Sequence, residues 1–176
     1  MFDYRGQVAS GCVARRLLIL PAMLVEVVFQ YRTLVGKCEL GVGLDWDEIE
    51  QMTAIESAFA PSSDDRRMKA GRKFRREPVK MTALLRGDRI HDRVDVTEIG
   101  PGGVVVRRAP FIAHGEHVEI VLDAGASSFR FCAQGVWLKD DGDDYKVGLV
   151  FVGMPVCLHS VVLRRGADDV LERIAA

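Results

Sequence analysis

A dense cluster of basic side chains lies near the middle of the sequence. Seven Lys and Arg residues occupy the eleven positions from Arg66 to Arg76. Guanidinium groups pair with phosphate through two parallel hydrogen bonds, and they also donate to the O6 and N7 acceptors of guanine. A guanine nucleotide would offer both targets. A solvated basic linker and a nucleic-acid patch are the alternative interpretations of such a run.

A second set of polar and small residues extends from Asp95 to Gly103, where we expect a loop between two strands. The Asp95 carboxylate can accept hydrogen bonds from the N1 and N2 donors of a guanine edge, and the Thr97 hydroxyl can donate or accept. The glycines of this stretch would let the backbone approach a ligand closely. The same residue types are common in ordinary strand connections, so the stretch alone does not require a ligand.

The strands that must position the basic cluster and the Asp95 to Gly103 stretch lie after Pro78. There, short segments rich in Val, Ile and Phe alternate apolar and polar residues. A small antiparallel barrel is favoured, because closure of the sheet removes exposed strand edges. In the strand that starts at Ser128, we expect a bulge or bend at Gly135. The six predicted strands are Val79 to Arg86, Arg89 to Val96, Gly103 to Arg108, His117 to Leu122, Ser128 to Leu138 and Tyr145 to Val152.

The N-terminal part predicts two helices that form a hairpin. Apolar residues recur at helical spacing from Pro21 to Val35, and Gly36 suits the position after the helix. The second helix is expected from Trp46 to Phe59, with Asp45 and Glu48 as a capping box. Two helices alone bury too little surface to be stable, so they must pack on the rest of the chain or on a second copy.

Turn-forming residues from Ala60 to Asp65 separate the helices from the β-rich part. We therefore expect an α+β chain, mainly β, with a helical region over residues 1–60 and a linker and basic arm over 61–77. The barrel would occupy residues 78–155. A helical tail is predicted over 156–176, with its amphipathic stretch from Asp168 to Ile174.

Three motifs, in the same order, resemble the PilZ domain family. Arg72 and Arg76 form an RxxxR motif before the first strand, and Asp95 to Gly100 is similar to [DN]xSxxG with threonine in place of serine. Gly135-Val136-Trp137 followed by Tyr145 to Phe151 resembles the last strand pair of that barrel. The match spans roughly residues 66–153, about half of the chain.

This resemblance implies a six-stranded barrel that binds cyclic di-GMP and has no catalytic activity. It further implies that the arginines of the arm contact phosphate and guanine, while Asp95 and Thr97 form the facing rim. Because Pro101, Gly102 and Gly103 lengthen the expected loop by about three residues, the glycine that closes the pocket is left open among Gly100, Gly102 and Gly103. The ligand-binding set is Arg72, Arg75, Arg76, Asp95, Thr97, Gly100, Gly102 and Gly103.

The expected function is a cyclic di-GMP receptor that changes its conformation or its contacts with an unidentified protein partner. Bacterial motility or surface behaviour is the process that the resemblance implies. The alternative is a PilZ-like adaptor that has lost ligand binding and makes protein contacts independently of nucleotide. In either case the N-terminal helices could also mediate a homo-oligomer.

Composition argues against several other classes. The formal net charge is −1 and the sequence pI is about 6.4, so no overall field would recruit DNA. The most apolar run, Leu17 to Phe29, is too short for a membrane span and contains Pro21 and Glu26.

The remaining reactive side chains give no sign of a catalytic or metal centre. The four cysteines are widely spaced without a CxxC pair, which indicates reduced thiols in a cytoplasmic protein. His114 and His117 have HxxH spacing but no third ligand nearby in the sequence. We therefore expect no metal site, no cofactor other than the cyclic di-GMP ligand, and no enzyme activity.

Overall fold

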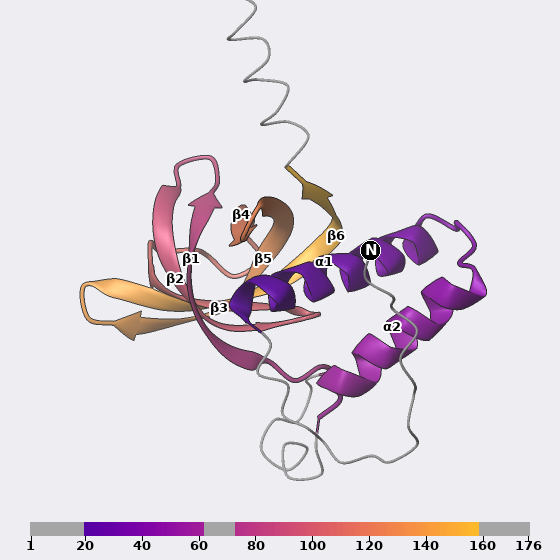
Figure 1. The fold of residues 1–176 in the computed structure, drawn as a ribbon. Helices are drawn as coiled ribbons and strands as arrows, with labels where there is room; N and C mark the ends of the chain where they lie inside the picture. Colours follow the sequence, from indigo (N-terminus) through magenta and orange to yellow (C-terminus); the bar gives the residue numbers. More distant parts are fainter. Residues whose placement is uncertain (1–19, 62–72, 159–176) are drawn as a thin grey trace, which may run out of the picture.

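The computed structural model describes residues 20–61 and 73–158. Figure 1 shows a barrel of strands with a pair of helices packed on one side. The described part contains helices α1 (Pro21–Glu39) and α2 (Trp46–Phe59) and strands β1 (Glu77–Arg86), β2 (His91–Gly100), β3 (Gly103–Ala109), β4 (His117–Ala124), β5 (Ser127–Asp141) and β6 (Asp144–Cys157).

The six strands form a closed antiparallel barrel in the order β1-β2-β3-β6-β5-β4. Closure comes from the pairing of β1 with β4, where Ala83 lies opposite Leu122 and Arg86 opposite Glu119. Each of the six predicted strands is present, which confirms the barrel expected from the alternating pattern. The predicted irregularity at Gly135 is also confirmed, because the register between β5 and β6 shifts between Gly135 and Trp137.

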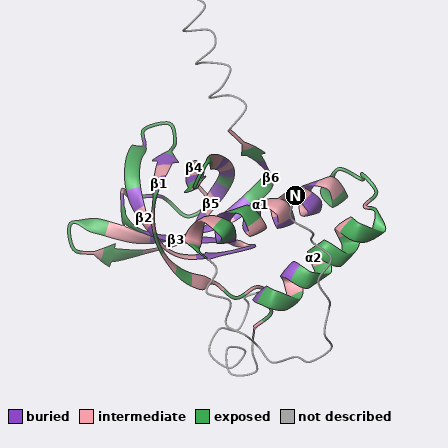
Figure 2. Cartoon of the chain, in the orientation of Figure 1, coloured by how far each residue is buried: buried purple, intermediate pink, exposed green. Residues whose placement is uncertain are grey.

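The barrel core is built by the side chains that alternate inward along each strand. Val94 and Val96 of β2 are buried, while Asp95 between them turns outward. Phe131 and Phe151 stack inside with ring centroids 4.5 Å apart. Figure 2 shows the same alternation as buried and exposed stripes along the strands. The outward side chains of β2 therefore lie on the outer surface of the barrel.

Helix α1 begins at Pro21 as predicted but ends at Glu39, so the prediction of Gly36 as the terminating residue is wrong. Gly36 lies within the helix and against Met154 of β6, whose Cε would be 2.9 Å from a Cβ at this position. The glycine permits close packing of the helix on the barrel rather than a turn. The Phe29 ring also packs on Phe129 of β5, with centroids 4.4 Å apart.

Helix α2 has the predicted bounds and the predicted capping box. The Glu48 backbone N–H donates to Asp45 Oδ1 at 2.8 Å, and the Asp45 N–H donates to Glu48 Oε2 at 3.3 Å. Ile55 and Phe59 are buried, but Ile49 near the start of the helix is 38% exposed. The two helices therefore pack on the rest of the chain chiefly through α1, as Figure 1 shows.

The expected loop from Asp95 to Gly103 is absent. Residues 95–100 continue β2, Pro101 and Gly102 make a two-residue turn, and Gly103 opens β3 opposite Gly100. The expectation of a lengthened loop is thus wrong, because pairing with β1 and β3 keeps residues 95–100, including the bulge at Thr97, in β2.

The last strand of the barrel is longer than the sequence predicts. Strand β6 runs to Cys157, two residues beyond the barrel boundary expected from the sequence. The predicted helix from Asp168 to Ile174 and most of the linker and arm, including Arg72, lie outside the described residues. Neither helix of the described part is long and apolar enough to cross a membrane.

Candidate ligand-binding site

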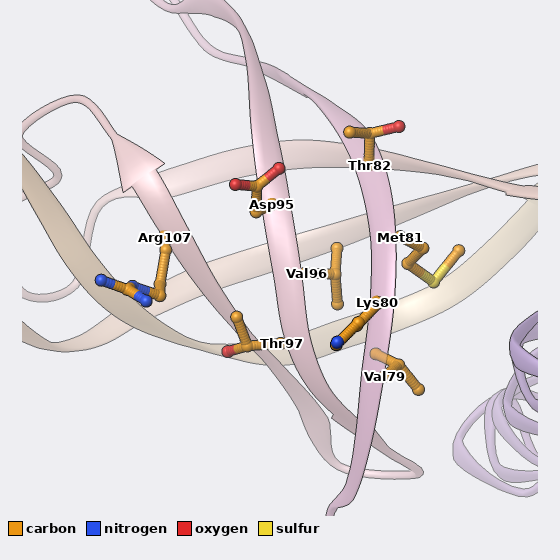
Figure 3. Close-up of a pocket in the computed structure, with 8 residues that line it drawn as sticks. All are labelled: Val79, Lys80, Met81, Thr82, Asp95, Val96, Thr97 and Arg107. Carbon is orange, nitrogen blue, oxygen red and sulfur yellow. The ribbon is translucent and has the colours of Figure 1, made fainter.

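A pocket of about 480 Å³ opens on the outer face of β1, β2 and β3. Figure 3 shows the residues that line it, which include apolar, charged and hydroxyl side chains. Two predicted site residues, Asp95 and Thr97, belong to it. The complete lining is Val79, Lys80, Met81, Thr82, Asp95, Val96, Thr97 and Arg107.

Two irregularities of strand pairing coincide at Thr97 and shape this pocket. In β1, Val79 and Lys80 together lie opposite Thr97, because Pro78 pairs with Glu98 and Met81 with Val96. In β2, Thr97 is itself an extra residue relative to β3. Bulges of this kind bend a strand and redirect its side chains. The Thr97 hydroxyl donates to the Val105 carbonyl at 3.3 Å, which fixes it beside the pocket.

A third bulge, in β3, brings two arginines to the site. Arg107 and Arg108 together lie opposite Lys146 of β6, and Arg108 adopts a φ of 53°. Positive φ is uncommon for a residue other than glycine, and such strained positions often occur at functional sites. Both arginine side chains are exposed as a result.

Each of these arginines has an acidic partner. Arg108 Nη2 donates to Asp95 Oδ1 at 2.5 Å. Arg107 donates to both carboxylate oxygens of Asp141, at 2.6 and 2.8 Å. The hydrogen bonds from Arg107 hold the pKa of the Asp141 carboxyl below its usual value. The site therefore carries a row of exposed ion pairs along β2, β3 and the β5–β6 hairpin.

The described end of the basic arm lies against the turn between β2 and β3. A Cβ on Gly100 would be 2.5 Å from the Arg75 carbonyl oxygen, and a Cβ on Gly102 would be 3.6 Å from the Phe74 ring. Arg76 Nη2 donates to the Leu149 carbonyl at 3.4 Å, and Arg75 forms an ion pair with Glu77. A Cβ on Gly103 would be 2.0 Å from the Leu149 carbonyl oxygen, so Gly100 allows the arm, and Gly103 allows β6, to approach the turn closely.

The predicted site residues that the structure describes, which exclude Arg72, consequently fall into two groups. Asp95 and Thr97 line the pocket, whereas Arg75 and Arg76 lie with the glycines at the turn and do not line it. Sequence reasoning missed Lys80 and Arg107, which are part of the lining. The alternation of side chains along the first strand places Lys80 on its outward face, so this residue could have been predicted from the sequence. No sequence pattern predicts the bulge that exposes Arg107 and Arg108 side by side.

No family model matches the sequence, and no curated protein matches it. Among solved structures, the chain is similar to the crystal structure of the Borreliella burgdorferi PlzA protein in complex with c-di-GMP. The identity is 10%, the TM-score is 0.37, and the match covers 62% of this chain and 43% of that chain. This chain thus spans less than half of that structure, and a match of this extent assigns it neither a site nor a ligand.

Proposed function

We propose that this protein is a PilZ-type receptor that binds cyclic di-GMP on the outer face of β1, β2 and β3. The observation that supports the proposal most directly is the pocket in which Asp95 and Thr97, the acidic and hydroxyl residues of the DxTxxG motif, lie side by side. A carboxylate and a hydroxyl together match the donor and acceptor atoms of a guanine edge.

The arm supplies the second half of the proposed site. Phe74 to Arg76 lead into β1 beside the turn that ends the motif. Arg72 is four residues before Arg76, close enough along the chain to reach a ligand bound at this face. In this proposal Arg72 contacts phosphate and guanine, and Arg76 contributes to the same ligand contact while it also binds the Leu149 carbonyl.

Contacts between the arm and the helices give the ligand a route to a response. The Arg75 N–H donates to the Phe59 carbonyl at 2.6 Å, and the Phe74 ring meets Tyr31 edge to face with centroids 5.3 Å apart. A ligand that binds the arm in one position would favour one arrangement of α1 and α2, provided that its affinity differs between arrangements. The receptor would then change its contacts with a protein partner, in the cytoplasm of a bacterium and without catalysis, to regulate motility or surface behaviour.

Titration calorimetry with cyclic di-GMP tests the binding step. The native chain is expected to bind, and Arg72→Ala and Asp95→Asn are expected to weaken binding by about tenfold each, since each removes a charged hydrogen-bonding group. Asp92→Asn, on the same strand but outside the pocket lining, is the matched control and should bind as the native chain does. Absence of binding by the native chain would refute the proposal.

A second candidate function is a nucleotide-independent adaptor, favoured by apolar side chains around the turn between α1 and α2. Trp46 is 85% exposed and Leu40 73%, with Val42 nearby. Such residues suit a protein contact, either with a partner or with a second copy of the chain. A partner set in pull-down experiments that is unchanged by added cyclic di-GMP and by Arg72→Ala, but is lost on Trp46→Ser, would favour this function over the first.

A further inference from the structure

We propose that Lys80 and Arg107 provide the phosphate-binding charge of the outer-face pocket, and that Asp141 holds Arg107 until a ligand phosphate replaces it. The inference rests on the proposed function and deepens it, because it concerns how the same pocket would hold the charged part of a nucleotide. Neither cation belongs to the RxxxR and DxTxxG motifs.

The composition of the pocket motivates this assignment. Val79 and Met81, which are partly exposed, give the lining an apolar part that suits a purine ring, while Asp95 and Thr97 suit its polar edge. A nucleotide also brings phosphate, which requires positive charge. Among the lining residues, Lys80 and Arg107 carry that charge, from β1 and β3 on either side of β2.

Lys80 is available for a ligand because of its place in the β1 bulge. Its side chain is exposed, and Figure 3 shows the ammonium group directed toward Thr97. It makes no ion pair with any residue of the described ranges 20–61 and 73–158. A lysine ammonium is a compact point charge that can donate in several directions, which suits a phosphate oxygen near Thr97.

The Arg107 guanidinium is already paired with the Asp141 carboxylate, but a ligand phosphate could replace that carboxylate. Figure 3 shows the guanidinium turned away from Asp95, and both of its hydrogen bonds go to Asp141 on the β5–β6 hairpin. Because Arg107 is exposed and Asp141 is partly exposed, solvent screens this ion pair, and a ligand phosphate can compete for the guanidinium. A phosphate presents the same pair of oxygens to the guanidinium fork, so it can take the place of the Asp141 carboxylate.

Calorimetric titration with cyclic di-GMP at low and high salt tests the exchange. We expect Lys80→Gln and Arg107→Gln each to lower the affinity by about tenfold and to reduce its dependence on salt. Asp141→Asn should raise the affinity, because it frees Arg107 without altering the pocket. Lys139→Gln is the matched control, since this exposed cation lies near the same hairpin but outside the lining. Far-ultraviolet circular dichroism of each variant checks that the barrel is retained.

The outcomes separate this inference from the proposed function. Native binding with unchanged affinity in Lys80→Gln and Arg107→Gln would overturn the inference and leave the receptor function standing. If the native chain binds no cyclic di-GMP, the receptor function fails, and titration with inorganic pyrophosphate followed by NMR decides the inference. Shifts at the Lys80 Hε and Arg107 Nε resonances would support a phosphate site in the pocket, and their absence would overturn it.

Discussion

Arg108 donates to Asp95 across 2.5 Å, so the acidic side chain of the proposed ligand site already has a cationic partner. The contact exists because β3 bulges at Arg107 and Arg108, where the backbone of Arg108 takes a positive φ. Asp95 itself points outward from β2, between two buried valines. A guanine edge that pairs with Asp95 must therefore share this carboxylate with Arg108 or displace the Arg108 guanidinium from it.

Replacing Arg108 should for this reason strengthen ligand binding. Arg108→Gln removes the competing charge and leaves the Asp95 carboxylate open to the ligand. The expected gain in cyclic di-GMP affinity is at most about fivefold, because exposed ion pairs are weak. Calorimetry on the variant and on Arg89→Gln, an exposed arginine in the turn before β2, provides the measurement and its control. Weaker binding by Arg108→Gln would mean instead that Arg108 contacts the ligand.

The glycines at the turn between β2 and β3 should differ sharply in their tolerance of alanine. A Cβ on Gly103 would lie 2.0 Å from the Leu149 carbonyl oxygen, at a φ of 155°. Gly103→Ala must push β3 from β6, and we expect it to lower the free energy of unfolding by about 2–4 kcal/mol. Urea denaturation measures this loss, with Gly102→Ala as a nearly neutral control.

Gly100→Ala should affect the arm more than the barrel. Its Cβ would lie 2.5 Å from the Arg75 carbonyl oxygen, so the arm must move while the pairing of β2 with β3 can persist. The expected result is weaker cyclic di-GMP binding with a smaller loss of stability than in Gly103→Ala. Native affinity in Gly100→Ala would show that the position of the arm does not matter for the ligand.

The link between the arm and the helices should depend on Phe74. Its ring packs edge to face on Tyr31, and removal of a partly buried aromatic side chain is expected to cost about 1–3 kcal/mol of stability. In Phe74→Ala the Arg75 amide, which donates to the Phe59 carbonyl, should also lose protection from hydrogen exchange. Phe111→Ala, at an exposed edge-to-face pair with Tyr145, should leave that amide protected.

Tyr31 should make the protein less stable at alkaline pH. Burial, and then the hydrogen bond that its hydroxyl donates to Glu56 at 2.9 Å, raise the pKa of Tyr31 above its ordinary value of 10.0. The unfolded chain therefore loses this proton first, and the stabilisation is complete below pH 10.0 but declines as pH rises toward the folded-state pKa.

The free energy of unfolding, measured from about pH 9 to about pH 11, checks this prediction. Tyr31→Phe cannot ionise, so the decline should be shallower in the variant than in the native chain. Equal slopes in the two proteins would contradict it, because other alkaline groups would then account for the whole effect.

Local sequence was sufficient for most elements. The capping box at Asp45 and Glu48 involves four consecutive residues, so the start of α2 could be predicted without any distant contact. The strands were predictable because inward and outward side chains alternate along each of them, whatever their partners are. Asp95 and Thr97 could likewise be proposed as candidate site residues from their types and spacing, and the structure places both in the lining of one pocket.

Other features depended on contacts between distant parts of the chain. Gly36 suggested a helix end, yet α1 continues because Met154 of β6 packs closely on that glycine. The glycines and proline after Asp95 suggested a long loop, yet pairing with β1 and β3 keeps residues 95–100 in a strand. Local propensity yields to packing and to backbone hydrogen bonding in both cases.

The sequence by itself therefore determined the barrel, the helix α2, and the acidic and hydroxyl residues offered for a ligand. The tertiary structure decided the register of the strands, the bulges at Thr97 and Arg108, and thus the entry of Lys80 and Arg107 into one pocket. The physical reason is that a bulge arises from a mismatch between two paired strands, and neither strand alone specifies its partner's register.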